Sequence, residues 1–362
     1  MNPLNQIRNL DQSIWLDLLD REIMTSGKLQ SLIDNDDLGG LTSNPSIFEK
    51  AISGSSDYNE DIGNLAQTKT DNSAIFFDLA IADIQKAADI FKPVYDKTNG
   101  KDGFVSLEVS PYLARDTDGT IEQARELWIR VDRKNVMIKI PGTKEGLIAI
   151  RECLREGINI NVTLLFGLPR YREITEAFMG GLEDRLAEGN SIKDVASVAS
   201  FFLSRIDVMV DPMLKEKGAE NLNGKIAIAS AKQAYQIYLE MISSDRFKKL
   251  EENGAQKQRV LYASTGTKDP SFSDVLYVES IIGKDTINTL PIETIDAFRD
   301  HGKAEETLTT NLEEAKKAMA ELKEKGIDID KITQKLEDEG IEKFNQAYEK
   351  LIKSIDNQKR KL

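Results

Sequence analysis

The residue with the clearest chemical potential is Lys139, which lies inside the apolar run 136–141. The β-branched residues around it and the Pro141-Gly142 pair that follows predict a short buried strand ending at a loop. A charged amine at that depth is costly unless it is paired, and a desolvated lysine is the usual amine for a Schiff base with a carbonyl substrate. A lysine that pairs with an acid, or that reaches water at a strand end, would produce the same pattern.

Other polar residues stand within or just after strand-like runs, and they include acids, amides, hydroxyls and cations. They are Asp17, Thr42, Asn44, Glu108, Asn161, Thr163, Ser200, Arg205 and Lys268. Together with Lys139 they supply the parts of a class I aldol site. These parts are an amine, an acid or base, and groups that bind a polyol.

Each of these residues also has a structural interpretation. Asp17 could cap the next helix, Asn44 with Pro45 could form only a turn, and Glu108 could be the ion-pair partner of Lys139. Asn161 and Thr163 could satisfy strand ends. Ser200 could be a small packing residue and Arg205 a surface ion-pair partner. The joint pattern favours a site, because nearly every strand places polar atoms at one end.

Two scarce residue types exclude several kinds of catalysis. The chain has one histidine, His301, in a polar stretch typical of a solvated helix end, and one cysteine, Cys153, on an apolar helical stripe. Ser-His-Asp and Cys-His catalysis are therefore not expected, nor is a zinc site of the His/Cys type. Acid and base roles must then fall to carboxylates, lysines, tyrosines or water.

Charge and composition limit the partners. The 362 residues carry a formal charge of −13, with 40% hydrophobic and 30% charged residues. This acidity argues against nucleic acid or an anionic membrane, and an anionic substrate must be met by a few local cations. The early charges Arg8, Asp11 and Asp17 argue against a signal peptide, and no apolar run approaches a membrane span. With a single cysteine, this composition suits the cytoplasm.

The elements that must position these residues alternate between strands and helices. Strands are expected at 13–17, 39–43, 103–109, 136–140, 158–165, 195–202, 259–264 and 286–290. Eight strands with helices between them predict an α/β fold, a (β/α)₈ TIM barrel, in which chemistry occurs at the carboxyl ends of the strands.

The helical segments have their own signals. A capping box at 120–123 predicts a helix start, and helical spacing over 75–87 is expected to end at Pro93. After Gly302 the chain becomes rich in Glu, Lys and Ala. We therefore expect a catalytic barrel domain over 1–303 and a helical extension over 304–362 that packs on the barrel. No glycine-rich phosphate loop is present.

Five segments, in order along nearly the whole chain, resemble the transaldolase family in its longer form with a C-terminal helical extension. They are Leu41–Phe48, Ser106–Ser110, Val136–Pro141, Asn159–Phe166 and Val198–Arg205. The resemblance implies a (β/α)₈ barrel that needs no cofactor or metal and acts in the pentose phosphate pathway. It also implies sugar-phosphate substrates, and it leaves open whether the chain is a monomer or a homodimer.

The resemblance also implies catalytic roles. Lys139 matches the Schiff-base lysine, and Asp17 matches the acid/base that removes the proton of the donor's C4 hydroxyl. Glu108 and Thr163 match the pair that holds a catalytic water during imine formation.

Substrate-binding roles follow in the same way. Asn44 and Asn161 match residues that hold substrate hydroxyls, and Thr42 and Ser200 are further candidates. Arg205 matches a phosphate-binding arginine. Family members usually place a second cation near strand seven, and Lys268 is the substitute that this chain offers there.

The expected reaction moves a dihydroxyacetone unit from sedoheptulose 7-phosphate to glyceraldehyde 3-phosphate, giving erythrose 4-phosphate and fructose 6-phosphate. Two alternatives remain: a lyase of the fructose-6-phosphate aldolase type, and a catalytically silent sugar-phosphate-binding barrel. Related aldolases tend to carry Tyr and Gln where this chain has Phe202 and Glu108, so both residues favour transfer. The presence of Lys139, Asp17 and Glu108 together argues against a silent barrel.

Overall fold

A closed ring of eight parallel strands forms the centre of the computed structural model, which describes residues 2–361. Each strand pairs with the next in sequence, and β8 pairs with β1. The strands are β1 Gln12–Leu16, β2 Gly40–Leu41, β3 Phe104–Glu108, β4 Val136–Pro141, β5 Ile160–Leu165, β6 Ser197–Phe202, β7 Arg259–Ala263 and β8 Thr286–Leu290. This confirms the predicted (β/α)₈ barrel, although β2 is much shorter than expected.

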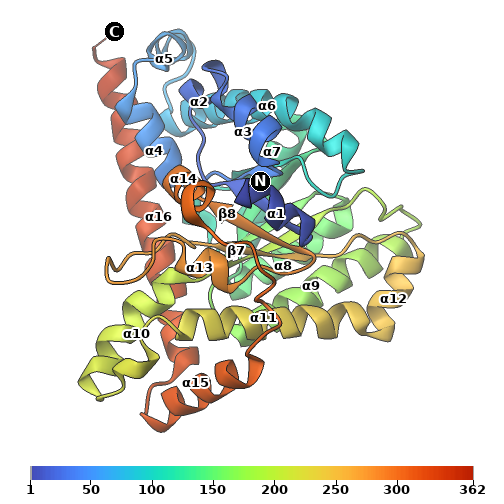
Figure 1. Cartoon of the computed structure of the whole chain (residues 1–362). Coiled ribbons are helices and arrows are strands. Elements are labelled where there is room, and N and C mark those ends of the chain that lie inside the picture. Colours follow the sequence, from blue (N-terminus) through green and yellow to red (C-terminus); the bar gives the residue numbers. More distant parts are fainter. Residues whose placement is uncertain (1, 362) are drawn as a thin grey trace.

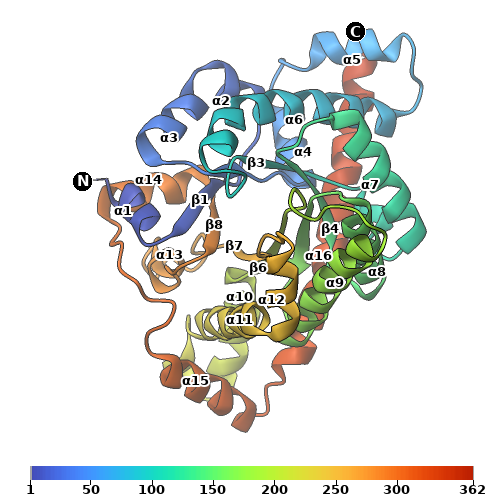
Figure 2. The same ribbon diagram turned by 90° about the vertical axis from the view of Figure 1, so that its right-hand side faces the viewer.

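Helices surround the ring (Figures 1 and 2). They are α1 Pro3–Asn9, α2 Arg21–Thr25, α3 Lys28–Asp36, α4 Pro45–Gly54, α5 Asn59–Ala66, α6 Asn72–Lys97, α7 Thr117–Val131, α8 Lys144–Glu156, α9 Leu168–Ala187, α10 Ser204–Glu216, α11 Ile226–Ser243, α12 Asp245–Glu252, α13 Leu276–Ser280, α14 Ile292–His301, α15 Leu312–Glu324 and α16 Ile329–Lys359. Two short 3₁₀ turns, η1 Pro111–Leu113 and η2 Glu220–Leu222, complete the connections.

Two helix boundaries differ from the sequence prediction. The N-cap of α7 is Asp116, whose side chain accepts from the Gly119 N–H, so the helix begins one turn before the expected capping box at Thr120. Pro93 lies inside α6 and does not end it. Pro93 is exposed, so water can satisfy the carbonyl of Asp89 that loses its helical partner.

The chain after Gly302 folds as two helices, as the change in composition predicted. Lys232 on α11 anchors the segment before α15, because its amine donates to the carbonyls of Thr307 and Thr310 at 2.8 and 2.6 Å. The long α16 lies beside α4 and also contacts α10 and the end of β5 (Figures 1 and 2). It therefore reaches the carboxyl end of β5, on the side of the barrel where the expected site lies.

A buried ion-pair cluster lies at the opposite, amino-terminal mouth of the barrel. Asp102, which is fully buried, pairs with Arg259 at 2.9 Å and with Arg8. It also accepts from the Ser13 hydroxyl at 2.7 Å and from the Trp15 indole at 3.2 Å. Burial alone would raise the pKa of Asp102, but Arg259 and Arg8 lower it to about 2.

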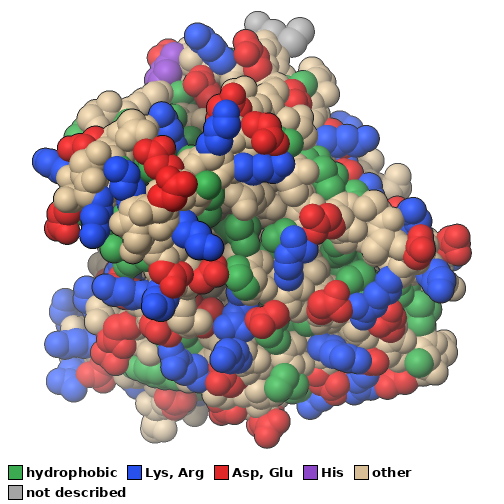
Figure 3. All heavy atoms as spheres, turned by 90° about the horizontal axis from the view of Figure 1, so that it is seen from below, with side chains coloured by type: hydrophobic (Ala, Val, Ile, Leu, Met, Phe, Trp, Pro, Cys, Tyr) green, Lys and Arg blue, Asp and Glu red, His purple; other side chains and the backbone are tan. Residues whose placement is uncertain are grey.

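The molecular surface is mixed in charge. On the face shown in Figure 3, Lys and Arg side chains alternate with Asp and Glu side chains. Among the described helices, none is long and apolar enough to span a bilayer.

Candidate active site

A cavity of about 660 Å³ opens at the carboxyl ends of the strands, where barrel enzymes place their chemistry. Eight of the ten residues predicted for the site line it: Asp17, Thr42, Asn44, Lys139, Thr163, Ser200, Arg205 and Lys268. The other two lie directly beside these residues, Glu108 next to Lys139 and Asn161 next to Ser200. The strand ends therefore bring together groups that are far apart in the sequence.

Lys139 projects from β4 into the floor of this cavity, and only 4% of the residue is exposed. Its Nζ donates to the Ser43 carbonyl oxygen at 2.8 Å and lies 3.2 Å from Oε2 of Glu108. Glu108 is therefore an ion-pair partner of Lys139, as one interpretation predicted, and Lys139 still lines the cavity. A buried amine with an acid beside it is the arrangement that Schiff-base chemistry needs.

Asp17 follows β1 and faces the same floor. Its backbone N–H donates to the Leu290 carbonyl at 2.8 Å, and its carboxylate accepts from the Thr42 hydroxyl at 2.8 Å. Asp20, and not Asp17, caps the next helix. Burial raises the pKa of Asp17, although Lys139 and the Thr42 hydrogen bond oppose that shift. A carboxylate with a raised pKa is a better base than an ordinary aspartate.

Glu108 and Thr163 carry unsatisfied oxygens next to Lys139. The carboxylate oxygens of Glu108 and the Thr163 hydroxyl are buried. Oε2 of Glu108 faces the Lys139 amine at 3.2 Å, whereas Oε1 of Glu108 and the Thr163 hydroxyl have no hydrogen-bond partner within residues 2–361. Burial raises the pKa of Glu108, which Lys139 opposes and the charge of Asp17 reinforces. Buried polar atoms without a partner usually mark the place of a water or ligand.

A chain of hydrogen bonds between side chains crosses the barrel beside these residues. The Ser200 hydroxyl donates to Asn161 Oδ1 at 2.7 Å, and Asn161 Nδ2 donates to the Ser106 hydroxyl at 3.0 Å. All three side chains are buried. The chain fixes the orientation of the Asn161 amide, so the residue that reaches the cavity surface is Ser200.

Asn44 performs two tasks. Its side chain accepts from the N–H groups of Ser46 and Ile47, both at 3.0 Å, and so caps α4. It also lines the cavity. The turn interpretation and the site interpretation of Asn44–Pro45 are thus both present in the structure.

The rim of the cavity carries cations suited to an anion. Arg205 lies in the first turn of α10, with its guanidinium carbon 5.8 Å from the centre of the Phe202 ring. Its Nη1 is buried with no hydrogen-bond partner in the described part of the chain. Burial lowers the pKa of Arg205, opposed by Asp17 and Glu339. Lys268 lines the same cavity from the loop after β7. The structure therefore brings the two predicted cations to one cavity.

The lining residues that sequence reasoning missed include Lys50 of α4 and Phe344 of α16. Lys50 lies on the helix that Asn44 caps, six residues further along, so its closeness to a predicted site residue could have marked it as a candidate. Phe344 gave none, because its helical spacing is typical of a packing residue and nothing local shows where α16 lies.

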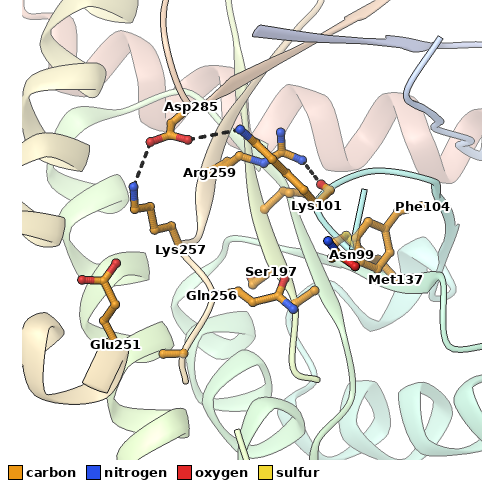
Figure 4. Close-up of a pocket in the computed structure, with 14 residues that line it drawn as sticks. Asn99, Lys101, Phe104, Met137, Ser197, Glu251, Gln256, Lys257, Arg259 and Asp285 are labelled. Atoms are coloured by element: carbon orange, nitrogen blue, oxygen red, sulfur yellow. Dashed lines mark hydrogen bonds and ion pairs between the residues drawn. The ribbon is translucent and has the colours of Figure 1, made fainter. Parts of the chain in front are cut away.

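A second cavity of about 340 Å³ opens at the amino-terminal mouth of the barrel (Figure 4). Lys257 contacts Asp285 at 2.9 Å and Lys101 contacts the same carboxylate at 3.5 Å. Arg259 pairs with Asp102. Since each of these cations already has a carboxylate partner, the larger cavity is the better candidate for substrate.

Comparison with known proteins agrees with this geometry. Residues 14–355 match the family model described as Transaldolase/Fructose-6-phosphate aldolase. The chain is 46% identical over 374 residues to the protein named transaldolase of Trichodesmium erythraeum, an alignment covering 100% of this chain and 98% of that protein. It is 45% identical over 370 residues to transaldolase 2 of Nostoc sp., with 98% and 97% covered. Transaldolase of Parafrankia sp. is 46% identical over 360 residues, with 98% of each covered.

Proposed function

The chain belongs to the transaldolase/fructose-6-phosphate aldolase family, whose members act on sugar phosphates, and we propose that its transaldolase activity proceeds through a Schiff base on Lys139. The observation that carries this assignment is the buried amine of Lys139 in one cavity with Asp17, beside the unsatisfied oxygens of Glu108 and Thr163.

The reaction begins at the donor carbonyl. Neutral Lys139 attacks C2 of the ketose phosphate, and loss of water from the carbinolamine gives a protonated imine that accepts electrons. Asp17 takes the proton of the C4 hydroxyl, the C3–C4 bond breaks, and the aldose phosphate leaves. A three-carbon enamine stays on Lys139. Its carbon attacks the acceptor aldehyde, Asp17 returns the proton to the new alkoxide, and water releases the ketose product.

Glu108 and Thr163 suit the proton transfers of imine formation. A water held between their free oxygens would lie beside Nζ of Lys139, and it would carry protons to and from the carbinolamine. Burial raises the pKa of Glu108, which makes its carboxyl a better proton acceptor than an ordinary glutamate and suits it to exchange protons with that water. We assign the substrate hydroxyls to Thr42, Asn44 and Ser200, with Asn161 behind them orienting the Ser200 hydroxyl.

The phosphate group is assigned to Arg205 and Lys268 at the rim. The buried Nη1 of Arg205 has a donor to offer, and a phosphate oxygen is the acceptor that a guanidinium binds best. Lys268 then adds a second positive charge from the loop after the neighbouring strand, β7.

Transfer, as opposed to release, requires that water be kept from the enamine. The aromatic rings of Phe202 and Phe166 pack together with their centroids 5.2 Å apart, and Phe202 lines the cavity. This apolar wall favours transfer of the dihydroxyacetone unit from sedoheptulose 7-phosphate to glyceraldehyde 3-phosphate. The lyase remains the second candidate, because it would use the same amine.

Borohydride trapping tests the assignment of Lys139. With fructose 6-phosphate and borohydride, we expect mass spectrometry to find a reduced three-carbon adduct on the peptide that contains Lys139. The Lys139→Ala variant should give no adduct, because the amine is gone. An adduct on another lysine, or an adduct retained in Lys139→Ala, would discard this site.

Product analysis separates transferase from lyase. Without an acceptor aldose, a transferase stalls after a single turnover, whereas a lyase continues to release dihydroxyacetone. With sedoheptulose 7-phosphate as the donor, we expect stalling, with net turnover restored when glyceraldehyde 3-phosphate is added.

We also propose a cytoplasmic location, which the low cysteine content supports, and a division into a barrel domain over 1–303 and an extension over 304–362. Whether the chain is a monomer or a homodimer is decided by light scattering of the purified protein.

A further inference from the structure

The long helix α16 approaches the end of β5 unusually closely, at a glycine. Gly340 is buried against Leu164 and Phe166, and a Cβ atom added to it would lie 3.0 Å from Leu164 Cδ2 and 3.7 Å from Phe166 Cε2. The first distance is tighter than ordinary van der Waals contact, so a side chain at 340 would push on Leu164. This glycine is what lets the helix backbone lie directly on Leu164.

Leu164 is itself in a costly backbone conformation. Its φ is 53°, in the left-handed region that residues other than glycine rarely adopt. The pairing of β5 with β6 shifts register between Val162 and Leu165, so Leu164 belongs to an irregular step in the strand. Such a conformation persists only where the surrounding structure holds it.

The residue just before Leu164 is Thr163, whose unsatisfied hydroxyl lines the cavity beside Lys139. The irregular step therefore places two consecutive side chains in different surroundings, Thr163 at the cavity and Leu164 against α16. Because adjacent residues share a peptide plane, a displacement of Leu164 moves Thr163 as well.

Two further contacts hold α16 to the connection that follows β5. A Cβ on Gly167 would lie 2.9 Å from the Thr333 hydroxyl, so the loop also needs a glycine where the helix passes. One turn further, Arg170 Nε lies 3.5 Å from Glu337. The helix thus lies against this connection over several residues.

We propose that Gly340 is a positioning residue for the reaction: by letting α16 press on Leu164, it fixes the left-handed step that aims Thr163 at Lys139. This inference rests on the proposed function, because it needs the roles of Lys139 and Thr163. It assigns to the C-terminal helix a share in the geometry of imine formation.

The first test is Gly340→Ala, measured as the rate of formation of the borohydride-trapped adduct at saturating fructose 6-phosphate. Alanine favours helix over glycine, so α16 itself should not weaken. We expect imine formation to slow by about 10-fold, because small misplacements of a catalytic group are costly. The KM for the sugar phosphate should change much less, since Arg205 and Lys268 lie on other elements.

The matched control is Gly54→Ala, at the last residue of α4. A Cβ there meets nothing within 4 Å, so this variant makes the same chemical change in open space. We expect its rate of imine formation to equal that of the unmodified protein. A folded Gly340→Ala protein that also keeps the unmodified rate would overturn the proposal.

A double-variant cycle tests the route through Leu164. Leu164→Ala removes the atom that the new Cβ would meet, so adding Gly340→Ala to it should change the rate by less than about twofold. An equal slowing by Gly340→Ala with and without Leu164→Ala would exclude this contact as the cause. If Gly340→Ala folds poorly, Leu164→Ala alone loosens the same contact and should itself slow imine formation, and an unchanged rate there contradicts the proposal.

The unmodified protein keeps the two hypotheses apart. If it forms no adduct, the proposed function fails, whatever the variants do. If it forms the adduct on Lys139 and Gly340→Ala forms it equally fast, only the positioning role fails.

Discussion

At the scale of single residues, the site depends on one cation shared by two acids. Lys139 lies beside both Asp17 and Glu108, and burial raises the pKa of each carboxyl while the lysine opposes the shift. Only Asp17 has a hydroxyl donor that stabilises its charged form, from Thr42 at 2.8 Å. That difference suits Asp17 to the role of base and Glu108 to that of a carboxyl exchanging protons through water.

Replacing Thr42 should therefore move the pH dependence of the reaction. Thr42→Val removes the donor to Asp17, so the charged carboxylate loses stabilisation and the pKa of Asp17 rises further. The acidic limb of the kcat/KM profile should move to higher pH, with a several-fold loss on the acidic side and a smaller loss above neutral pH. Thr289→Val is the control, because Thr289 contacts Thr42 at 2.7 Å and leaves the bond to Asp17 intact. A limb that does not move would separate Asp17 from the rate-limiting proton transfer.

At the scale of elements, α10 carries Arg205 and is held in place by Asp207, a buried acid on the same helix. Asp207 accepts from the Ala227 N–H and from the Tyr277 hydroxyl, both at 2.8 Å, and so ties α10 to α11 and α13. Burial raises the pKa of Asp207 to about 7, and these two hydrogen bonds oppose the shift.

This acid should make stability depend on pH. The folded protein keeps the Asp207 proton up to about pH 7, whereas the unfolded chain releases it near pH 4. Stability therefore falls as pH rises from about 4 to about 7, by about 1.4 kcal/mol per unit between the two pKa values, and then levels off. Asp207→Asn should remove this slope, so urea unfolding at pH 5 and pH 8 should show a smaller difference than in the unmodified protein. An identical difference in both proteins would mean that Asp207 does not carry the slope.

At the scale of the whole molecule, the barrel keeps chemistry and a stabilising ion-pair cluster at opposite mouths. The strands and their order were predictable, because each strand is a short apolar run and each polar residue that ends it projects toward the same rim. The start of α7 at Thr117, capped by Asp116, was less predictable, since two capping signals lie within about one turn. Phe344 and the cluster around Asp102 could not be foreseen, because they join segments whose proximity only the closed ring creates.

Removing the centre of that cluster should cost stability and leave chemistry intact. Asp102→Asn leaves Arg259 and Arg8 without their charged partner, and such a loss typically destabilises a protein by about 3–5 kcal/mol. We expect a lower urea midpoint with kcat per folded molecule unchanged. Asp285→Asn is the control, because its partners Lys101 and Lys257 are partly exposed. This substitution should lower the free energy of unfolding by about 1 kcal/mol or less.

The lowered pKa of Asp102 also predicts how stability changes in acid. The pKa of Asp102 is about 2 when folded, below its ordinary value near 4, so its contribution is complete above about pH 4 and is lost as pH falls through about 2. Acid unfolding of Asp102→Asn should lack this component.

The pairing of β1 with β8 has a consequence for folding of the chain during its synthesis on the ribosome. Asp17 follows the first strand, yet its backbone is held by Leu290, at the end of the last one. During synthesis at about 5–20 residues per second, the first strand must wait on the order of ten seconds or more for its partner. Until then the growing chain has an open edge and Asp17 lacks its backbone partner, so a nascent or truncated product that stops short of residue 290 cannot complete the proposed site.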